Sequence, residues 1–88
     1  MHVEIRKAGD VVIVDLKGKL TAGLGDQILR DTIDALLAEG WTKVVLNLSD
    51  VTTLDSAGLG ELVAGLRRCK AGGGRLSYRR ARQPGAVQ

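Results

Sequence analysis

Two kinds of apolar repeat alternate along this chain, and their alternation narrows the folds that it can form. Three segments carry apolar residues at every second position or in short β-branched runs: 3–7, 11–16 and 43–48. Two others, 24–39 and 56–70, carry them at the 3.6-residue period of a helix. Strands that alternate with helices predict a small sheet with helices packed on it.

Turn residues set the expected limits of these segments. Gly9-Asp10 predicts a hairpin turn between the first two strands. We expect a loop over 19–25, which holds two glycines, and short polar turns around Asp50. Residues 51–54 are expected to extend the edge of the sheet, and residues 75–78 to form a last strand.

The helical periodicity also predicts which side chains are buried. Gly40 is expected to end the first helix, and the three glycines at 72–74 the second. The continuous apolar run at 44–46 predicts a strand covered on both faces. The expected buried stripes are Leu24, Ile28, Leu29, Ile33, Leu36 and Leu37 in the first helix, and Leu59, Leu62, Val63, Leu66 and Cys69 in the second.

Length and composition exclude several classes of protein. Eighty-eight residues are enough for one domain, and the single cysteine (Cys69) and single histidine (His2) exclude an intrachain disulfide and a Cys/His zinc site. The pairs Gly23-x-Gly25 and Gly58-x-Gly60 lack the rest of a phosphate-binding fingerprint. We therefore expect no enzyme, no cofactor and no metal. The chain shows neither a bilayer-length apolar run nor a signal peptide, which predicts a reducing cytoplasm.

Basic charge gathers at the C-terminal end. Residues 1–70 hold all ten acidic residues, whereas residues 71–88 hold four arginines and no acid. We divide the chain into a domain over 1–76 and a basic, flexible tail over 77–88. An arm for nucleic acid or an anionic surface is the alternative for the tail, although one aromatic residue is too few for a stacking platform. No specific nucleic acid is expected.

The segment 55–60 joins a strand to a helix and carries the chemistry of most interest. Asp55 or Ser56 is suited to capping the helix, which accounts for one polar residue. Capping does not account for Gly58 and Gly60, each of which costs the helix about 1 kcal/mol relative to alanine. Either a neighbouring element or an outside partner comes close to this backbone, and the spacing leaves both open. Ser56 is also well placed to carry a phosphate, because helix N-termini favour anions.

At this point the sequence resembles the STAS domain of bacterial anti-sigma factor antagonists, over residues 1 to about 76. The resemblance implies an α/β fold, a small mixed sheet of about four strands with helices packed on one face. The matching segments are VVIVDLKGKL at 11–20, DQILRDTIDALLAEG at 26–40, VVLNLSDVTTL at 44–54 and, above all, the phosphorylation-site motif DSAGLGEL at 55–62.

The resemblance also implies a function. An anti-sigma factor antagonist is a non-catalytic, cytoplasmic phospho-switch. It binds an anti-sigma factor, often a GHKL-type serine kinase, and releases it when phosphorylated, and a PP2C-type phosphatase reverses the modification. Ser56 is then the phosphoacceptor. The implied partner-binding residues are Asp55, Ala57, Gly58, Leu59 and Gly60, together with Leu20, Thr21, Gly23 and Leu24 of the preceding loop.

The sequence departs from the family in two places. Thr21 stands where many members carry an aspartate. The family continues from the last strand into another helix, whereas RRARQPGAVQ at 79–88 has almost no apolar face, so the final helix is expected to be missing. A truncated or frame-shifted gene and a natural short variant both fit. An apolar patch on the sheet would then lack its cover, which predicts weak stability or a homodimer through that patch.

Three other functions compete with the switch. A STAS scaffold without phosphorylation would serve as a subunit of a lipid-transport or sensor complex. An enzyme such as an NTPase is opposed by the lack of a base, a metal site and a phosphate loop. A nucleic-acid arm in the tail would show steeply salt-dependent DNA binding.

Overall fold

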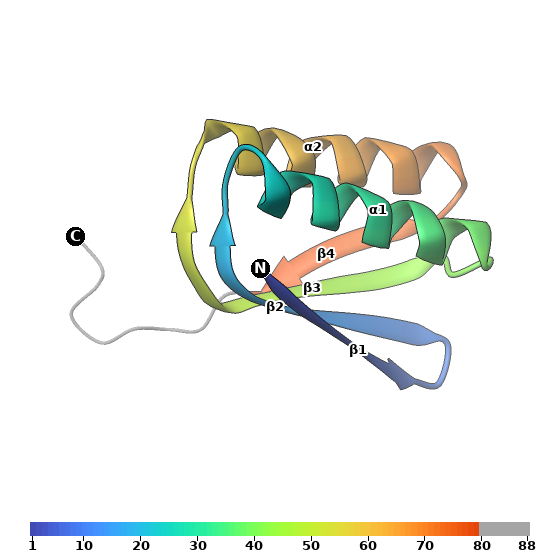
Figure 1. The fold of residues 1–88 in the computed structure, drawn as a ribbon. Coiled ribbons are helices and arrows are strands. Elements are labelled where there is room, and N and C mark those ends of the chain that lie inside the picture. The colour runs from blue at the N-terminus through green and yellow to red at the C-terminus, as the bar shows by residue number, and fades with distance from the viewer. Residues whose placement is uncertain (80–88) are drawn as a thin grey trace.

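Four strands and two helices make up residues 1–79, the part of the chain that the computed structural model describes (Figure 1). The expected order of elements is confirmed. The elements are β1 (His2–Ala8), β2 (Val11–Leu20), α1 (Leu24–Ala38), β3 (Lys43–Leu54), α2 (Ser56–Ala71) and β4 (Arg75–Arg79).

The strands form one mixed sheet in the order β1-β2-β3-β4. β1 and β2 are antiparallel and meet at the predicted Gly9-Asp10 turn, where Gly9 has a φ of +64°. β2 pairs with β3 and β3 with β4 in parallel. Both parallel connections step the same way across the sheet, so the usual right-handed crossover places α1 and α2 on one face.

β2 and β3 are longer than the sequence indicates. The loop expected from Lys19 begins only after Leu20, and no turn interrupts β3 at Asp50. The reason is tertiary pairing, because the end of β2 lies beside the end of β3, with Lys17 opposite Asp50 and Leu20 opposite Leu54. Two shifts of register accommodate the polar residues, and Gly18 takes a φ of +100° beside them.

The helices end where their glycines predict. After α1, Gly40 has a φ of +95°, and the Trp41 N–H donates to the Leu36 carbonyl oxygen at 3.1 Å. After α2, Gly73 has a φ of +81°, and the Gly74 N–H donates to the Cys69 carbonyl oxygen at 2.8 Å. These turns reverse the chain into β3 and β4.

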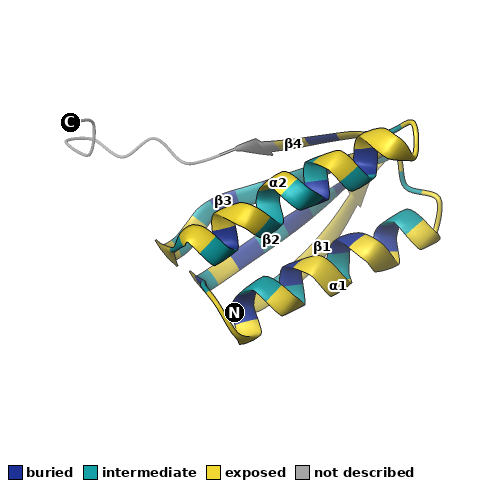
Figure 2. Ribbon diagram, turned by 90° about the horizontal axis from the view of Figure 1, so that it is seen from above, coloured by how far each residue is buried: buried dark blue, intermediate teal, exposed yellow. Residues whose placement is uncertain are grey.

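The core lies between the helices and one face of the sheet (Figure 2). Cys69 is fully buried there, as expected, and burial raises the pKa of its thiol. The prediction that 44–46 is covered on both faces is wrong, because both helices lie on one side and Val45 on the other face is only half-buried. The buried apolar residues are Val12, Val14, Leu16, Leu20, Leu29, Ile33, Leu36, Val44, Leu46, Leu48, Cys69 and Leu76.

The two helical stripes are only partly buried. Leu24 at the start of α1 is 71% exposed, and Leu59 and Val63 of α2 are 53% and 44% exposed. Expecting these three in the core was wrong, because no described element packs over that side of either helix. α2 instead buries Gly58, Gly65 and Cys69.

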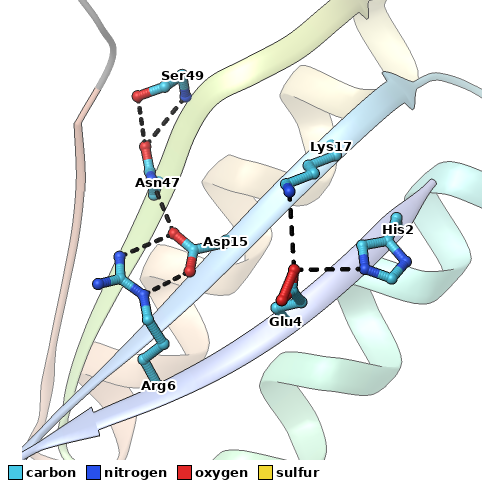
Figure 3. A network of polar contacts seen from close by, with 7 residues as sticks. All are labelled: His2, Glu4, Arg6, Asp15, Lys17, Asn47 and Ser49. Atoms are coloured by element: carbon cyan, nitrogen blue, oxygen red, sulfur yellow. Dashed lines mark hydrogen bonds and ion pairs between the residues drawn. The ribbon is translucent and has the colours of Figure 1, made fainter.

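A polar network joins three strands across the face of the sheet without helices (Figure 3). The Asp15 carboxylate of β2 accepts two hydrogen bonds from the Arg6 guanidinium, at 2.6 and 2.9 Å, and one from the Asn47 amide at 2.7 Å. Asn47 in turn accepts from the Ser49 hydroxyl at 2.6 Å. Each side chain of the network hydrogen-bonds to another member, so we assign the network a structural role, in which it links β1, β2 and β3.

The expected boundary at residue 76 falls inside a strand, because β4 continues to Arg79. The flexible tail and the missing final helix were predictions about the residues that follow. Those from 80 to 88 lie outside the described part of the chain.

Candidate partner-binding site at the start of α2

The Asp55 side chain joins two segments that are distant in sequence. As the N-cap of α2, its carboxylate accepts a hydrogen bond from the Gly58 N–H at 2.9 Å. Its other oxygen accepts one from the Ala22 N–H at 3.0 Å, in the turn before α1. Asp55 therefore both starts α2 and holds the 21–23 turn against it.

These hydrogen bonds also set the charge of the site. They hold the pKa of the Asp55 carboxyl below its usual value, with the Ala22 N–H as the larger cause and the Gly58 N–H as the next. A carboxylate that accepts backbone N–H groups is favoured in its ionised form. The site thus holds a negative charge at neutral pH beside the first turn of α2.

Glycine allows the close packing of these segments. A Cβ at Gly58 would overlap the carbonyl oxygen of Leu20, and one at Gly25 would lie 2.5 Å from the carbonyl oxygen of Lys19. Deeper in α2, a Cβ at Gly65 would lie 2.7 Å from Cδ1 of Ile33. Gly60 differs, because a Cβ there would meet no atom within 4 Å. Each of the two explanations left open by the sequence therefore applies at a different position. Gly58 and Gly65 allow close packing within the chain, whereas Gly60 faces outward, where a partner could approach.

Ser56 is the exposed first residue of α2. Asp55 takes the capping role, and among residues 1–79 no hydrogen bond engages the Ser56 hydroxyl. The Ser56 side chain is thus accessible to another protein, at the positive end of a helix dipole.

The structure divides the predicted partner-binding residues into two groups. Leu20 and Gly58 are buried, so they lie beneath the outward surface and position the site from inside. Asp55, Ala57 and Thr21 are half-buried at its base. The exposed members are Gly23, Leu24, Leu59 and Gly60, which with Ser56 form the outward surface.

Sequence reasoning missed the rest of this surface. A shallow hollow on the outside of α2 continues from Ser56, Leu59 and Gly60 to Val63, Ala64 and Arg67. Spacings of three and four place them on one side of the helix. Val63 was assigned to the core because it belongs to the apolar stripe; the outward spacing of Gly60 and Ala64 was the signal that could have found this face.

Residues 1–79 contain no group of three or more side chains that could together hold a metal ion. No described helix combines the length and the apolar character needed to cross a bilayer.

With the geometry established, comparison with known proteins gives the family. A family model described as "Mlab, STAS domain" matches residues 3–87. The chain therefore belongs to the STAS domain family, as the motif at 55–62 indicates, and its four-stranded mixed sheet with two helices is the fold of that family.

Solved structures with this fold include a putative anti-sigma factor antagonist from Thermotoga maritima. It is 28% identical with a TM-score of 0.77, and the match covers 86% of this chain and 65% of that one. The unphosphorylated anti-sigma factor antagonist SpoIIAA, from Bacillus, is 22% identical with a TM-score of 0.72, over 88% of this chain and 71% of that one. Mglu is 29% identical with a TM-score of 0.76, over 97% of this chain but only 20% of Mglu.

Proposed function

We propose that this chain is a cytoplasmic anti-sigma factor antagonist with Ser56 as its switch. The unmodified protein binds an anti-sigma factor that is also a GHKL-type serine kinase, and it catalyses no reaction itself. The observation that carries the proposal is that Asp55 and Ser56 have different roles at the start of α2. Asp55 caps α2 and leaves the Ser56 hydroxyl exposed, beside the apolar Leu59 and the side-chain-free Gly60.

Unmodified, the site offers a partner a close approach. Leu24 and Leu59 supply exposed apolar area from two elements, and Gly60 lets a partner reach the helix backbone. Asp55 fixes the distance between the two elements through its hydrogen bonds to Ala22 and Gly58. A surface held rigid before binding loses little conformational entropy when the partner docks.

Phosphorylation changes this surface at one atom. The Ser56 Oγ attacks the γ-phosphorus of ATP held by the kinase. The new Oγ–P bond forms as the bond to ADP breaks, and the hydroxyl proton passes to a base on the kinase. A PP2C-type phosphatase hydrolyses the phosphoserine.

The added dianion opposes binding for two reasons. It stands beside the Asp55 carboxylate, which raises the negative charge of the surface, and it occupies the space next to Leu59 and Gly60. The helix N-terminus favours the phosphate itself, so the fold keeps its structure while the partner is released.

A capture experiment from native lysate tests the proposal. The baits are wild type, Ser56→Ala and Ser56→Asp, with Thr42→Asp as a matched control, because Thr42 is an exposed hydroxyl ahead of β3, at the opposite end of that strand from Ser56. We expect wild type, Ser56→Ala and Thr42→Asp to retain a GHKL-type kinase that Ser56→Asp does not retain.

One alternative makes a different prediction in the same experiment. A STAS scaffold subunit of a lipid-transport or sensor complex would bind its partner constitutively. Retention of one partner by all four baits would reject the switch and support the scaffold.

A further inference from the structure

An apolar groove of about 650 Å³ runs between α2 and β4. Its floor comes from the sheet, where Leu46, Leu48 and Leu76 line it, and one wall comes from α2. The rest of its lining consists of Leu54, Leu59, Leu62, Val63, Leu66 and Ser77. Leu54, Leu59 and Val63 are 43%, 53% and 44% exposed, which is unusual for large apolar residues that neighbour one another.

The charge along this groove is divided: Asp55 follows Leu54 at one end, whereas only basic residues lie toward the second half of α2. No aspartate or glutamate follows Glu61 in the sequence, so the second half of α2 and all of β4 lack acidic residues. The second half of α2 and β4 hold five basic residues: Arg67, Arg68, Lys70, Arg75 and Arg79.

Two of these cations lie outside the groove lining but on the Val63 side of α2. Arg67 and Lys70 follow Val63 by four and seven residues, which places them on the same side of α2 as this groove residue. Both are exposed, and among residues 1–79 no ion pair engages either side chain. Arg68 lies on another side of the helix, where it pairs with Asp34 of α1 at 2.8 Å and with Glu61 at 3.8 Å.

From this combination we infer that the groove binds an acidic amphipathic helix of a partner protein. An apolar channel beside an α-helix accepts the apolar face of another helix. The unpaired charges of Arg67 and Lys70 favour glutamates or aspartates that flank this face. The inference does not rest on modification of Ser56, although Leu59 belongs to both surfaces.

Other occupants from this chain fit less well. A second copy placed groove to groove would bring like charges together. The apolar stripe of its acidic helix α1 is already occupied beyond Leu24, because Leu29, Ile33 and Leu36 are buried in its own core. Residues 80–88 contain two further arginines and only Ala81, Ala86 and Val87 as apolar residues.

The test uses the full 88-residue chain and two designed peptides of the same length as α2, 16 residues. One peptide repeats leucine at i, i+3, i+4 and i+7 with glutamate elsewhere, and the other replaces each glutamate by lysine. Fluorescence anisotropy gives the affinity, and amide ¹H–¹⁵N spectra locate the site. We expect the glutamate peptide to bind about tenfold or more tightly than the lysine peptide. Its shifts should fall on Leu62, Leu66 and Leu76.

Variants distinguish charge recognition from apolar contact. Arg67→Glu with Lys70→Glu should reverse the preference between the peptides. Arg30→Glu, an exposed arginine on α1, is the matched control and should leave it unchanged. Ser56→Asp tests the proposed switch separately, so failure of the groove and failure of the switch can be told apart.

Several results would overturn the inference. Equal affinity for the two peptides, or shifts confined to α1, would show that the groove does not select an acidic helix. Nuclear Overhauser contacts between groove methyl groups and residues 80–88 in the free protein would assign the groove to the chain itself. Shifts of groove amides on dilution would assign it to a second copy. Binding to phosphatidylglycerol vesicles without binding to the glutamate peptide would assign it to a lipid surface.

Discussion

At the scale of single residues, the glycines of α2 have separate roles. Gly58 allows α2 to touch the backbone of Leu20, whereas Gly60 faces open space. The intrinsic cost of glycine in a helix is the same at both positions, about 1 kcal/mol relative to alanine. Only at Gly58 does internal packing explain why that cost is retained.

Alanine substitution at the two positions should therefore give opposite results. Gly60→Ala should raise the free energy of unfolding by up to about 1 kcal/mol through helix propensity. Gly58→Ala should lower it by roughly 2 kcal/mol or more, because the new Cβ overlaps the Leu20 carbonyl oxygen. Urea unfolding of both variants followed by circular dichroism measures the difference. A Gly58→Ala protein as stable as wild type would contradict the packing described here.

Asp55 is the residue whose side chain connects the two halves of the site. Asp55→Ala removes the cap of α2 and the hydrogen bond to Ala22, and should lower Tm by roughly 5 °C. Asp55→Asn retains an acceptor oxygen for capping and should therefore lower Tm by less. Thermal unfolding of the two variants checks the order, and an equal loss would mean that capping contributes little.

At the scale of elements, the sequence predicted which helices and strands exist better than it predicted what packs against them. The period of the apolar residues placed α1 at 24–39, within one residue of the observed Leu24–Ala38, and the start of α2 at Ser56. It could not show that Leu59 and Val63 are exposed, because periodicity tells which residues share a face and not whether another element covers it. Tertiary pairing likewise extends β2 and β3 through residues that favour turns.

The candidate site was predicted in the same partial way. The motif identified Asp55 and Ser56, and the structure assigns the cap to Asp55. The close contact between Gly58 and Leu20 depends on how β2 and α2 meet, which no local pattern encodes. The outward face from Leu59 to Arg67 was also missed, because Leu59 and Val63 were counted as core.

The uneven burial of the helices predicts uneven sensitivity to truncation. Leu29→Ala in α1 should cost about 2–5 kcal/mol, because Leu29 is fully buried. Leu59→Ala in α2 should cost less than about 1 kcal/mol, because Leu59 is about half exposed. The same Leu→Ala change at two helix positions provides its own control. Equal losses in urea unfolding would show that α2 is covered where the structure leaves it open.

At the scale of the whole molecule, one face of the sheet supports the helices and the other carries the polar network. The hydrogen bonds from Arg6, and next those from Asn47, hold the pKa of the Asp15 carboxyl below its usual value of 3.8. These contacts therefore stabilise the sheet most at pH values at which the Asp15 carboxyl is ionised.

This lowered pKa predicts a loss of stability in acid. A carboxyl with a lower pKa in the folded state stabilises the fold above its unfolded pKa, and the contribution is lost as the pH falls through the folded value. The wild-type protein should therefore lose stability as the pH falls below about 4. Asp15→Asn and Arg6→Ala should each be less stable at pH 7 and show a smaller loss in acid. Urea midpoints at several pH values test this, and an undiminished loss in both variants would contradict it.

At the same scale, the match covers only part of several of these solved structures. The chain spans 65% of the Thermotoga maritima protein, 71% of SpoIIAA and 20% of Mglu. The activities and partners of those whole proteins are therefore not carried over by the match. The surfaces of this chain, the start of α2 and the groove beside β4, are where its own partners have to be sought.

The central claim is that the state of Ser56 controls partner binding, and one titration tests it most directly. The kinase captured from lysate is titrated calorimetrically with the unmodified chain and with the same chain phosphorylated at Ser56. We predict that the unmodified chain binds and that the phosphorylated chain binds at least about 100-fold more weakly, as expected for a buried contact that gains an unpaired dianion. Equal affinities for the two forms would contradict the claim.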